Sequence, residues 1–245
     1  MSYKISINYS PNFYSKKRKT QDIKFIILHY TGMRTDKHSI NRLIDSESSV
    51  SCHYYIDKNG KIIAMVPDLY IAWHAGQSAW KRFKSLNKSS IGIEISNPGH
   101  QFGYRKFNRK QLNSLKKILN FLIKEYKINF KNILGHSDIS PLRKKDPGEK
   151  FPWNYLAKKK LCFWHSLKIS EIKKFRNERI TEIEKKIFFK NLSKIGYHNS
   201  NNKNESLFIF KAFQRRFRQD LINGIIDQEC LIISENLVKK FNKTS

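Results

Sequence analysis

Residues 134–148 read LGHSDISPLRKKDPG, and they place His136 and Asp146 ten residues apart in one proline-containing segment. Lys144 stands two residues before the aspartate. A catalytic zinc ion takes imidazole nitrogens and carboxylate oxygens from three protein residues and keeps one position open. The segment therefore predicts two of the three ligands of such a site. The alternative interpretation is that His136 and Asp146 only cap or turn the backbone of a loop.

A third ligand has to come from another part of the chain. His29 is the best candidate because it directly follows the apolar run Phe25–Leu28. An apolar run of this length is typical of a strand in a sheet that is covered on both faces. We therefore expect His29 to follow a buried strand, and His136 to follow the short strand of residues 133–134.

Glu94 and Lys144 are further candidates for chemistry. Glu94 stands in the strand-like segment 91–95, where a buried carboxylate is costly unless it is paired or used. Near a metal ion, such a carboxyl group can hold a proton near neutral pH and act as general base and acid. Lys144 can stabilise an oxyanion. The alternatives are a solvent-facing Glu94 on an edge strand and a solvated Lys144 that is one lysine among many.

The charge of the chain is strongly positive. Its 245 residues include 48 Lys and Arg against 20 Asp and Glu, which gives a formal net charge of +28. Such a charge attracts polyanions of any kind, including nucleic acid, anionic lipid and an acidic wall polymer. Drift in genomic base composition explains the same excess of lysine without a partner. No helix-turn-helix, zinc-finger or aromatic-rich RNA motif stands out, so we expect no specific nucleic acid partner.

Cysteine usage and the N-terminal residues bear on the compartment. Cys52, Cys162 and Cys230 are odd in number and far apart, so they indicate neither a metal-binding pair nor a disulfide framework. Residues 1–19 are polar and basic and lack the apolar centre of a secretory signal, and no apolar run is long enough to span a bilayer. We therefore expect a cytoplasmic protein without a transmembrane segment. The alternative is the periplasm or cell envelope, reached by an unrecognised export route.

Hydrophobic periodicity and turn residues divide the chain into segments. The expected segments are an irregular basic lead-in at 1–22, a buried strand at 25–28, a short helix from Thr35 or Asp36 to Ile44, a hairpin of 53–56 and 62–66 around Asn59-Gly60, a loop at 67–90, a strand at 91–95, a helix from Asn108 to Tyr126 with Gln111 at its capping-box position, and a long amphipathic helix within 157–190. From about residue 187 we expect small helices around a separate core.

Seven short motifs follow one another in an order that resembles a known enzyme family. They are ILHYTG (27–32), SxHY (51–54), AWHAG (72–76), SIGIEI (90–95), GHSD (135–138), KxDPG (144–148) and FPW (151–153). This arrangement is similar to that of the type-2 zinc N-acetylmuramoyl-L-alanine amidases, which are related to peptidoglycan recognition proteins and phage T7 lysozyme. The resemblance spans roughly residues 8–165. The segment Asn97-Pro98-Gly99 resembles the AmiD branch of the family more than the AmpD branch.

The resemblance implies one zinc ion per chain, bound by His29, His136 and Asp146. It implies that Glu94 is the general base and acid and that Lys144 stabilises the oxyanion. The implied fold is α/β, with a mixed central β-sheet flanked by helices, which agrees with the strands and helices expected from the periodicity.

Three further residues are expected to bind substrate. They are His53, His74 and Asn97. The two histidines fall in family motifs near the cleft, and the alternative for each is a hydrogen-bonded structural histidine.

The last part of the chain resembles a small all-α domain of three helices that binds peptidoglycan. The resembling motifs are LxxIGY (192–197), AFQxxF (212–217) and GxxD (224–227). The chain departs from the pattern at 228–230, where it reads Gln-Glu-Cys and the family usually has a threonine. The alternative is an inert helical packing module. We therefore expect an amidase domain at 1–165, a helical linker at 166–186 and a peptidoglycan-binding-like domain at 187–245.

The implied activity is zinc-dependent hydrolysis of the amide between the lactyl group of N-acetylmuramic acid and L-alanine. The substrate partner is peptidoglycan or a muropeptide, in bacterial cell-wall turnover or recycling, and we expect a monomer. A non-catalytic recognition protein of the same fold is the alternative, but the presence of all three ligands and Glu94 argues against it. A nucleic-acid-binding protein is a further alternative that only the charge favours.

Overall fold

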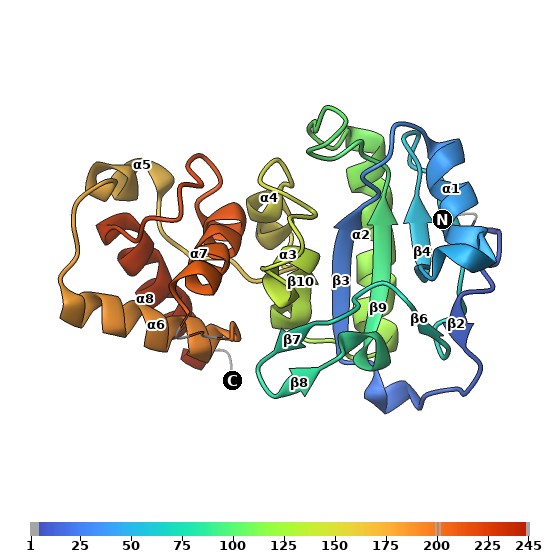
Figure 1. Cartoon of the computed structure of the whole chain (residues 1–245), viewed down its shortest axis with the longest axis horizontal. Coiled ribbons are helices and arrows are strands. Elements are labelled where there is room, and N and C mark those ends of the chain that lie inside the picture. The colour runs from blue at the N-terminus through green and yellow to red at the C-terminus, as the bar shows by residue number, and fades with distance from the viewer. Residues whose placement is uncertain (1–4, 199, 201, 244–245) are drawn as a thin grey trace.

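The central sheet has six strands in the order β1-β5-β4-β9-β3-β10 (Figure 1). This computed structural model describes residues 5–198, 200 and 202–243. The strands are β1 (Ile5–Ile7), β5 (Ile62–Ala64), β4 (Tyr54–Ile56), β9 (Ser90–Ile95), β3 (Phe25–Tyr30) and β10 (Ile133–Gly135). β4 and β5 pair antiparallel, and the other neighbours in this order pair parallel, so the sheet is mixed as the sequence predicts.

The two faces of the sheet differ, and β9 shows why. Its isoleucines are buried in the same hydrophobic cluster as the leucines of α2 (Arg109–Glu125), which lies behind the sheet in Figure 1. Successive side chains of a strand point to opposite faces. Ser90, Gly92 and Glu94 therefore point away from α2. One face of the sheet is apolar under α2, and the other offers polar groups for a site.

The helices α1 and α2 begin as predicted. The Asn108 side chain accepts a hydrogen bond from the backbone N–H of Gln111, and the Gln111 side chain accepts one from the backbone N–H of Asn108. This capping box satisfies two of the free N–H groups at the start of α2. α1 (Asp36–Ile44) is capped by Thr35, whose hydroxyl oxygen accepts a hydrogen bond from the N–H of His38.

The predicted hairpin of β4 and β5 is confirmed. Gly60 has a φ of +82°, and a Cβ atom there would lie 2.7 Å from the carbonyl oxygen of Lys110, so the turn requires glycine. Tyr55 and Ile63 join Leu43 of α1 in a second hydrophobic cluster, whereas the alternate residues of the hairpin belong to the cluster under α2. α1 and α2 therefore pack on opposite faces, as expected of the α/β fold.

The prediction of an irregular lead-in at 1–22 is wrong over the described residues. β1 extends the sheet beyond β5, and β2 (Phe13–Tyr14) pairs antiparallel with β6 (Ile71–Ala72). A short 3-10 helix, η1 (Thr20–Asp22), follows. These pairings join segments far apart in the chain, and a local pattern of two or three residues carries no sign of them. Residues 1–4 of the prediction lie outside the described residues.

The segment predicted as a loop at 67–90 contains short elements. Besides β6, it forms the hairpin of β7 (Ala79–Trp80) and β8 (Phe83–Lys84) and the 3-10 helix η3 (Leu86–Ser89). Other 3-10 helices are η2 (Ser46–Ser48) and η4 (Phe130–Asn132). The side-chain oxygen of Asn87 in η3 accepts the backbone N–H groups of His74 and Ala75 at 3.1 and 2.6 Å, which fixes this part of the segment.

The long helix predicted within 157–190 is not formed. The chain instead makes α4 (Trp153–Lys158), α5 (Ile169–Ile172), η5 (Lys173–Phe175) and the first part of α6 (Glu182–Ile195). Lys160 and Asn177 adopt positive φ values of 59° and 65°, which interrupt a regular helix. Residues 161–164 are buried in the core. The spacing of isoleucines suggested one amphipathic face, but buried aromatic residues turn the chain inward between short helices.

The predicted unit of three helices is confirmed. It consists of α6, α7 (Lys203–Phe217) and α8 (Gln228–Lys243), which we call the C-terminal module together with their connections. Figure 1 shows α7 beside α3 (His136–Ile139), the short helix that follows β10. Within the described part of the chain, no helix is both long and apolar enough to cross a membrane.

The prediction of a separate core for this module is wrong. Its buried side chains belong to one hydrophobic cluster with those of the sheet. The ring centroids of Trp80 and Tyr197 are 4.8 Å apart, and those of Trp164 and Phe217 are 5.5 Å apart. Aromatic residues from both parts of the chain therefore fill a common core. The domain boundaries at 165/166 and 186/187 stay a prediction.

Candidate active site

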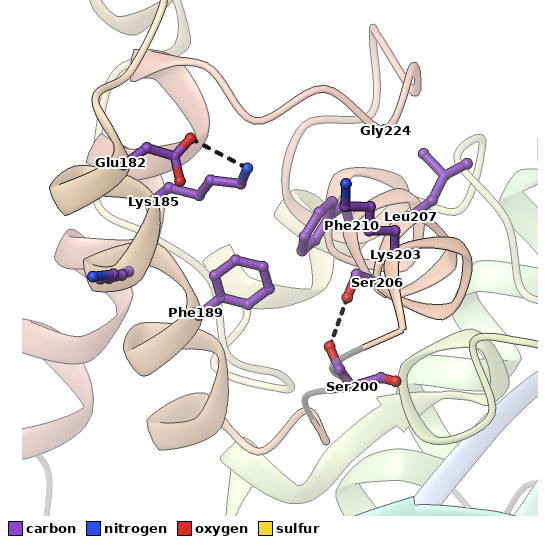
Figure 2. Close-up of a pocket in the computed structure, with 10 residues that line it drawn as sticks. Glu182, Lys185, Phe189, Ser200, Lys203, Ser206, Leu207, Phe210 and Gly224 are labelled. Atoms are coloured by element: carbon purple, nitrogen blue, oxygen red, sulfur yellow. Dashed lines mark hydrogen bonds and ion pairs between the residues drawn. The ribbon is translucent and has the colours of Figure 1, made fainter.

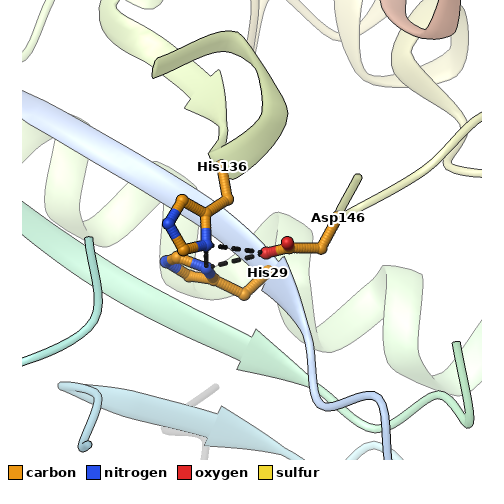
Figure 3. Close-up of side chains that lie close together, drawn as sticks. All are labelled: His29, His136 and Asp146. Atoms are coloured by element: carbon orange, nitrogen blue, oxygen red, sulfur yellow. Dashed lines mark hydrogen bonds and ion pairs between the residues drawn. The ribbon is translucent and has the colours of Figure 1, made fainter. Parts of the chain in front are cut away.

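Three side chains from distant parts of the chain converge near the carboxyl ends of β3 and β10 (Figure 3). His29 comes from β3, His136 begins α3 directly after β10, and Asp146 lies in the loop that follows. The Nδ1 atoms of His29 and His136 are 2.9 Å apart, and they lie 2.9 and 3.1 Å from Oδ2 of Asp146. All three side chains are buried. The structure thus brings together the residues that the sequence predicts as ligands.

A chain of hydrogen bonds fixes the protonation of His29. The Ser90 hydroxyl donates to the carbonyl oxygen of Leu86 at 2.6 Å, so Ser90 Oγ accepts the Nε2–H of His74 at 3.2 Å. Nδ1 of His74 is then an acceptor, and it receives the Nε2–H of His29 at 3.1 Å. Burial, followed by the neighbouring His136, lowers the pKa of His29 to about 4, which keeps the ring neutral. Nδ1 of His29 therefore presents a lone pair.

His136 also presents its Nδ1 atom to the cluster. Its Nε2 lies 3.2 Å from the carbonyl oxygen of Ala75, which only accepts, so Nε2 carries the proton and Nδ1 a lone pair. Burial raises the pKa of the Asp146 carboxyl group, but the imidazoles of His136 and His29 outweigh it and hold this pKa well below its usual range. Two lone pairs and a negative oxygen therefore face one point.

This donor set fits a small divalent cation. Three electron-rich atoms that face one another repel unless a positive charge lies between them. Zinc bonds of roughly 2.0–2.1 Å in a tetrahedral arrangement separate ligand atoms by about 3.3 Å. The observed separations of 2.9 to 3.1 Å are close to this value. Two neutral imidazoles and one carboxylate are also a common ligand set of catalytic zinc.

Glu94 lies beside this cluster. β9 runs between β4 and β3, so the alternative of a solvent-facing glutamate on an edge strand is wrong. Oε2 of Glu94 is buried and has no hydrogen-bond partner among the described residues. Burial, and next the negative charge of Asp146, raises the pKa of Glu94 to about 8, against the opposing charge of Lys144. A carboxyl group of this kind exchanges a proton near neutral pH.

An open cavity of about 440 Å³ gives access to these groups. Glu94, Lys144 and His74 line it together with His136 and Asp146. Three of the predicted site residues outside the ligand set therefore share one space with the cluster. The cavity has positively charged walls on the side of residues 143–145.

His53 and Asn97 do not line this cavity. His53 is fully buried, with its Nδ1 accepting the N–H of Gly92 at 3.0 Å and its Nε2 donating to the carbonyl oxygen of Tyr70 at 3.1 Å. Asn97 is 2% exposed, and its side-chain amide donates to the carbonyl oxygen of Arg105 at 2.8 Å. Both side chains hold backbone segments in place, and neither has exposed surface for a substrate contact.

Sequence reasoning missed other residues of the cavity wall. The hydroxyl of Tyr30 lies 2.8 Å from Nδ1 of His100, whose Nε2 lies 3.1 Å from a carboxylate oxygen of Glu149. Arg143 also lines the cavity, and it donates to the carbonyl oxygen of Gln77 at 2.7 Å. Tyr30 lies in the motif at 27–32, and Arg143 lies in the segment 134–148 that contains His136 and Asp146. His100 follows Asn97-Pro98-Gly99 and has no motif of its own.

The sequence of this chain matches known proteins over most of its length. Residues 19–149 match the family described as N-acetylmuramoyl-L-alanine amidase. The chain is 33% identical to the N-acetylmuramoyl-L-alanine amidase AmiD of Escherichia coli over 235 residues, which cover 90% of this chain and 84% of that protein. It is also 33% identical to the 1,6-anhydro-N-acetylmuramyl-L-alanine amidase AmpD of Haemophilus influenzae, over 60% of this chain and 88% of that protein.

Solved structures resemble the fold of nearly the whole chain. One is E. coli AmiD in complex with anhydro-N-acetylmuramic acid-L-Ala-D-gamma-Glu-L-Lys, with a TM-score of 0.78 and 30% identity over 94% of this chain and 98% of that one. Another is AmpDh3 of Pseudomonas aeruginosa, with a TM-score of 0.79 and 27% identity over 95% of this chain and 97% of that one. The similarity therefore includes the C-terminal module as well as the sheet.

Proposed function

This chain belongs to the N-acetylmuramoyl-L-alanine amidase family, and we propose that it hydrolyses the amide between N-acetylmuramic acid and L-alanine with a zinc ion held by His29, His136 and Asp146. The observation that carries the zinc assignment is the convergence of two imidazole lone pairs and one carboxylate, with Nδ1 atoms 2.9 Å apart. The hydrogen bonds on the far side of each ring keep both lone pairs turned to the same point.

Zinc in such a site polarises a carbonyl group and lowers the pKa of water to near 7. Glu94 supplies the proton transfers. Its ionised carboxylate accepts a proton from the attacking water, and the resulting acid gives the proton to the departing nitrogen of L-alanine. A pKa of about 8 suits both halves of this cycle, because neither form of the carboxyl group is strongly disfavoured near neutral pH.

Lys144 stabilises the negative charge that develops on the carbonyl oxygen. It lines the same cavity as Glu94, and its backbone N–H donates to the carbonyl oxygen of Ser140 at 3.0 Å, which fixes the start of its side chain. A cation aimed at an oxygen that becomes charged only in the transition state lowers the barrier without tightening the ground state.

We propose a muropeptide as the substrate that fills the cavity. Arg143, Lys144 and Lys145 lie along one wall, where they meet the carboxylates of a peptide stem. The ligand in the AmiD complex is an anhydromuramyl peptide. The volume of about 440 Å³ accommodates the sugar-proximal part of such a ligand, and the cavity is open to solvent, so the rest of the stem extends outward.

A second cavity, of about 600 Å³, lies between α6 and α7 of the C-terminal module (Figure 2). Lys185, Lys186 and Lys203 line it together with the rings of Phe189 and Phe210. Aromatic faces suit the apolar faces of sugar rings, and the lysines suit carboxylates of the wall polymer. We propose that this cavity binds peptidoglycan strands and keeps the enzyme on its substrate.

The alternative of a recognition protein that does not cleave is disfavoured by Glu94. A binding protein has no use for a buried carboxylate oxygen without a partner, because such a group costs free energy and contributes no contact to the ligand. The same group is expected of an enzyme that stores a proton beside its metal.

The experiment that tests the proposal offers the purified protein intact sacculi and anhydro-muropeptides, with and without a chelator. Mass spectrometry measures the release of free stem peptide, and elemental analysis measures bound zinc. We expect about one zinc ion per chain, release of stem peptides that begin with L-alanine, and loss of release after chelation with recovery on adding zinc. Zinc binding without any release would instead support the recognition protein.

A further inference from the structure

A buried carboxylate joins the candidate active site to the C-terminal module. Asp138 lies two residues after His136 and is 2% exposed. Its Oδ1 accepts a hydrogen bond from the hydroxyl of Tyr197 at 2.6 Å, and its Oδ2 forms a buried ion pair with the guanidinium of Arg216. Tyr197 follows α6 and Arg216 belongs to α7. Both oxygens of this carboxylate are therefore held by the C-terminal module.

Asp138 and Arg216 also hold the backbone segment that presents His136. Oδ2 of Asp138 accepts the backbone N–H of Gly135 at 2.7 Å, and Nη2 of Arg216 donates to the carbonyl oxygen of Ile133 at 3.0 Å. Ile133 and Gly135 are the first and last residues of β10, and His136 comes next. Arg216 thus fixes the end of this strand directly at one residue and through Asp138 at another.

The strand end has little freedom on its other side. A Cβ atom on Gly135 would lie 2.7 Å from Cδ of Pro147, the residue after Asp146. The N–H of Ser137 donates to the carbonyl oxygen of Asp146 at 2.8 Å. A shift of β10 therefore moves the segments that carry two of the three ligands together.

Arg216 is itself held by aromatic rings and by hydrogen bonds from both Nη atoms, although its buried Nε has no hydrogen-bond partner among the described residues. Its guanidinium lies 4.2 Å from the ring centroid of Trp153 and 5.1 Å from that of Phe217, and Nη2 also donates to the carbonyl oxygen of Phe163 at 3.5 Å. It is 3% exposed and does not line the cavity of the active site. A contact with substrate is thus excluded, and any effect on the reaction has to pass through Asp138 and β10.

We propose that the C-terminal module is a positioning element of the amidase site, in which Arg216 and Tyr197 hold Asp138 and thereby fix the end of β10 and the imidazole of His136. This inference rests on the proposed function, since it concerns the proposed metal site. It gives the C-terminal module, which resembles a wall-binding domain, a second task in positioning that site. Without Arg216, the Asp138 carboxylate is buried with one neutral donor from the module, so it shifts toward water and pulls on Gly135.

The test compares Arg216→Met with Arg176→Met in the full chain. Arg176, which precedes α6, pairs with Glu229 of α8, and Glu229 retains Arg218 at 3.6 Å, so this control removes another Arg–carboxylate ion pair of the C-terminal module without touching Asp138. The readouts are the zinc dissociation constant, the visible spectrum of the cobalt-substituted protein, and kcat and KM on a soluble muropeptide. A soluble substrate needs no anchoring on the wall.

For Arg216→Met we expect zinc binding that is weaker by about 10–100-fold, a changed cobalt spectrum and a fall in kcat of similar size, as for other groups that orient metal ligands. Arg216→Lys restores part of the affinity, and Arg176→Met stays within about twofold of the wild type. A folded Arg216→Met protein with wild-type zinc affinity, spectrum and kcat overturns the inference, even if its activity on intact sacculi falls.

Tyr197→Phe provides a second test of the inference if the Arg216→Met protein does not fold. It removes one hydrogen bond to Asp138 and keeps the ring that packs on Trp80. We expect a smaller loss of zinc affinity and an altered cobalt spectrum, whereas an unchanged spectrum and affinity count against the inference. Failure of the proposed function looks different, because a wild-type protein that binds zinc but releases no stem peptide refutes the amidase assignment and leaves the zinc measurements valid.

Discussion

Glu94 and His29 occupy paired positions of the neighbouring strands β9 and β3, so their side chains point to the same face of the sheet. This register places Glu94, the proposed proton-transfer group, beside His29, a proposed metal ligand, without any loop between them. Strands hold side chains more rigidly than loops do, and catalytic groups benefit from such fixed positions. In β9, isoleucines alternate with Ser90, Gly92 and Glu94, and in β3 the apolar run Phe25–Leu28 precedes His29, so the same two strands supply both the core and the site.

Replacing Glu94 by Gln or Ala tests its role in proton transfer. We expect both variants to keep zinc, because Glu94 is not part of the converging ligand set. Turnover should fall by about 10²–10⁴-fold, the usual contribution of a general acid–base group. Zinc content by elemental analysis and release of stem peptide by mass spectrometry give the two measurements. A Glu94→Gln protein that releases peptide at the wild-type rate would end this assignment.

The pKa of Glu94 also predicts how the stability of the metal-free protein depends on pH. The folded protein holds this proton to about pH 8, whereas an unfolded glutamate loses it near pH 4.5. The stabilisation is therefore fully present below about pH 4.5 and is lost progressively as pH rises to about 8, by at most about 1.4 kcal/mol per pH unit. The Glu94→Gln variant lacks this pH-dependent contribution to the free energy of unfolding.

The measurement is urea unfolding of the metal-free wild type and of Glu94→Gln between pH 5 and 9. Because the histidines are common to both proteins, their contributions cancel in the difference. We expect the free energy of unfolding of the wild type to fall relative to that of the variant as pH rises. Parallel curves over this range would show that Glu94 titrates normally.

His74 is expected to control the metal affinity through the ring of His29. His74→Phe removes the acceptor for the Nε2–H of His29 and leaves that proton buried without a partner. We expect zinc binding to weaken by about 10–100-fold, as is usual when the partner of a ligating histidine is lost. Ser90→Ala acts one step further along the chain and should cost less. Competition with a coloured chelator measures both, and equal affinities for all three proteins would contradict the tautomer assigned here.

A substitution at Gly92 tests independently whether the His74 ring controls zinc affinity. A Cβ atom at this position would lie 2.4 Å from the imidazole of His74, so Gly92→Ala has to displace that ring. The expected loss of zinc affinity is comparable to that of His74→Phe. Thermal unfolding serves as the control. A displaced His74 ring lowers the midpoint temperature of unfolding less than a globally destabilised sheet does.

Local segments of the sequence predicted the ligand set, whereas contacts between distant segments stayed invisible. His29, His136 and Asp146 each stand in a short motif whose spacing and order resemble a family, so their convergence was expected. The capping box of Asn108 and Gln111 and the turn at Gly60 were predicted for a similar reason, because each depends on a few adjacent residues.

The pairing of Asp138 with Arg216 spans 78 residues, and neither residue carries a sign of the other in its neighbourhood. The isoleucines after residue 166 suggested one long helix, because their spacing does not reveal that residues 161–164 turn into the core. His53 stands in a motif near the site, yet its hydrogen bonds commit it to the backbone. Sequence motifs locate such residues, but only the packing decides which side chains face the cavity.

The cavity of the C-terminal module predicts a difference between insoluble and soluble substrates. Attraction between the +28 chain and an anionic wall is screened within roughly 10 Å at 0.1 M salt. Raising the salt concentration should therefore reduce the activity on intact sacculi more than the activity on small muropeptides. Lys203→Glu should reduce the activity on sacculi and leave kcat on the soluble substrate within about twofold, because Lys203 lines the second cavity and not the first.

The matched control is Lys117→Glu, which changes the net charge equally on the exposed side of α2. If the module binds the wall through this cavity, Lys203→Glu lowers the sedimentation of protein with sacculi far more than Lys117→Glu does. Equal losses for the two variants would mean that overall charge holds the enzyme on the wall. That outcome would leave the cavity without a role in binding, and the module with the buried contacts of Arg216 and Tyr197 as its link to catalysis.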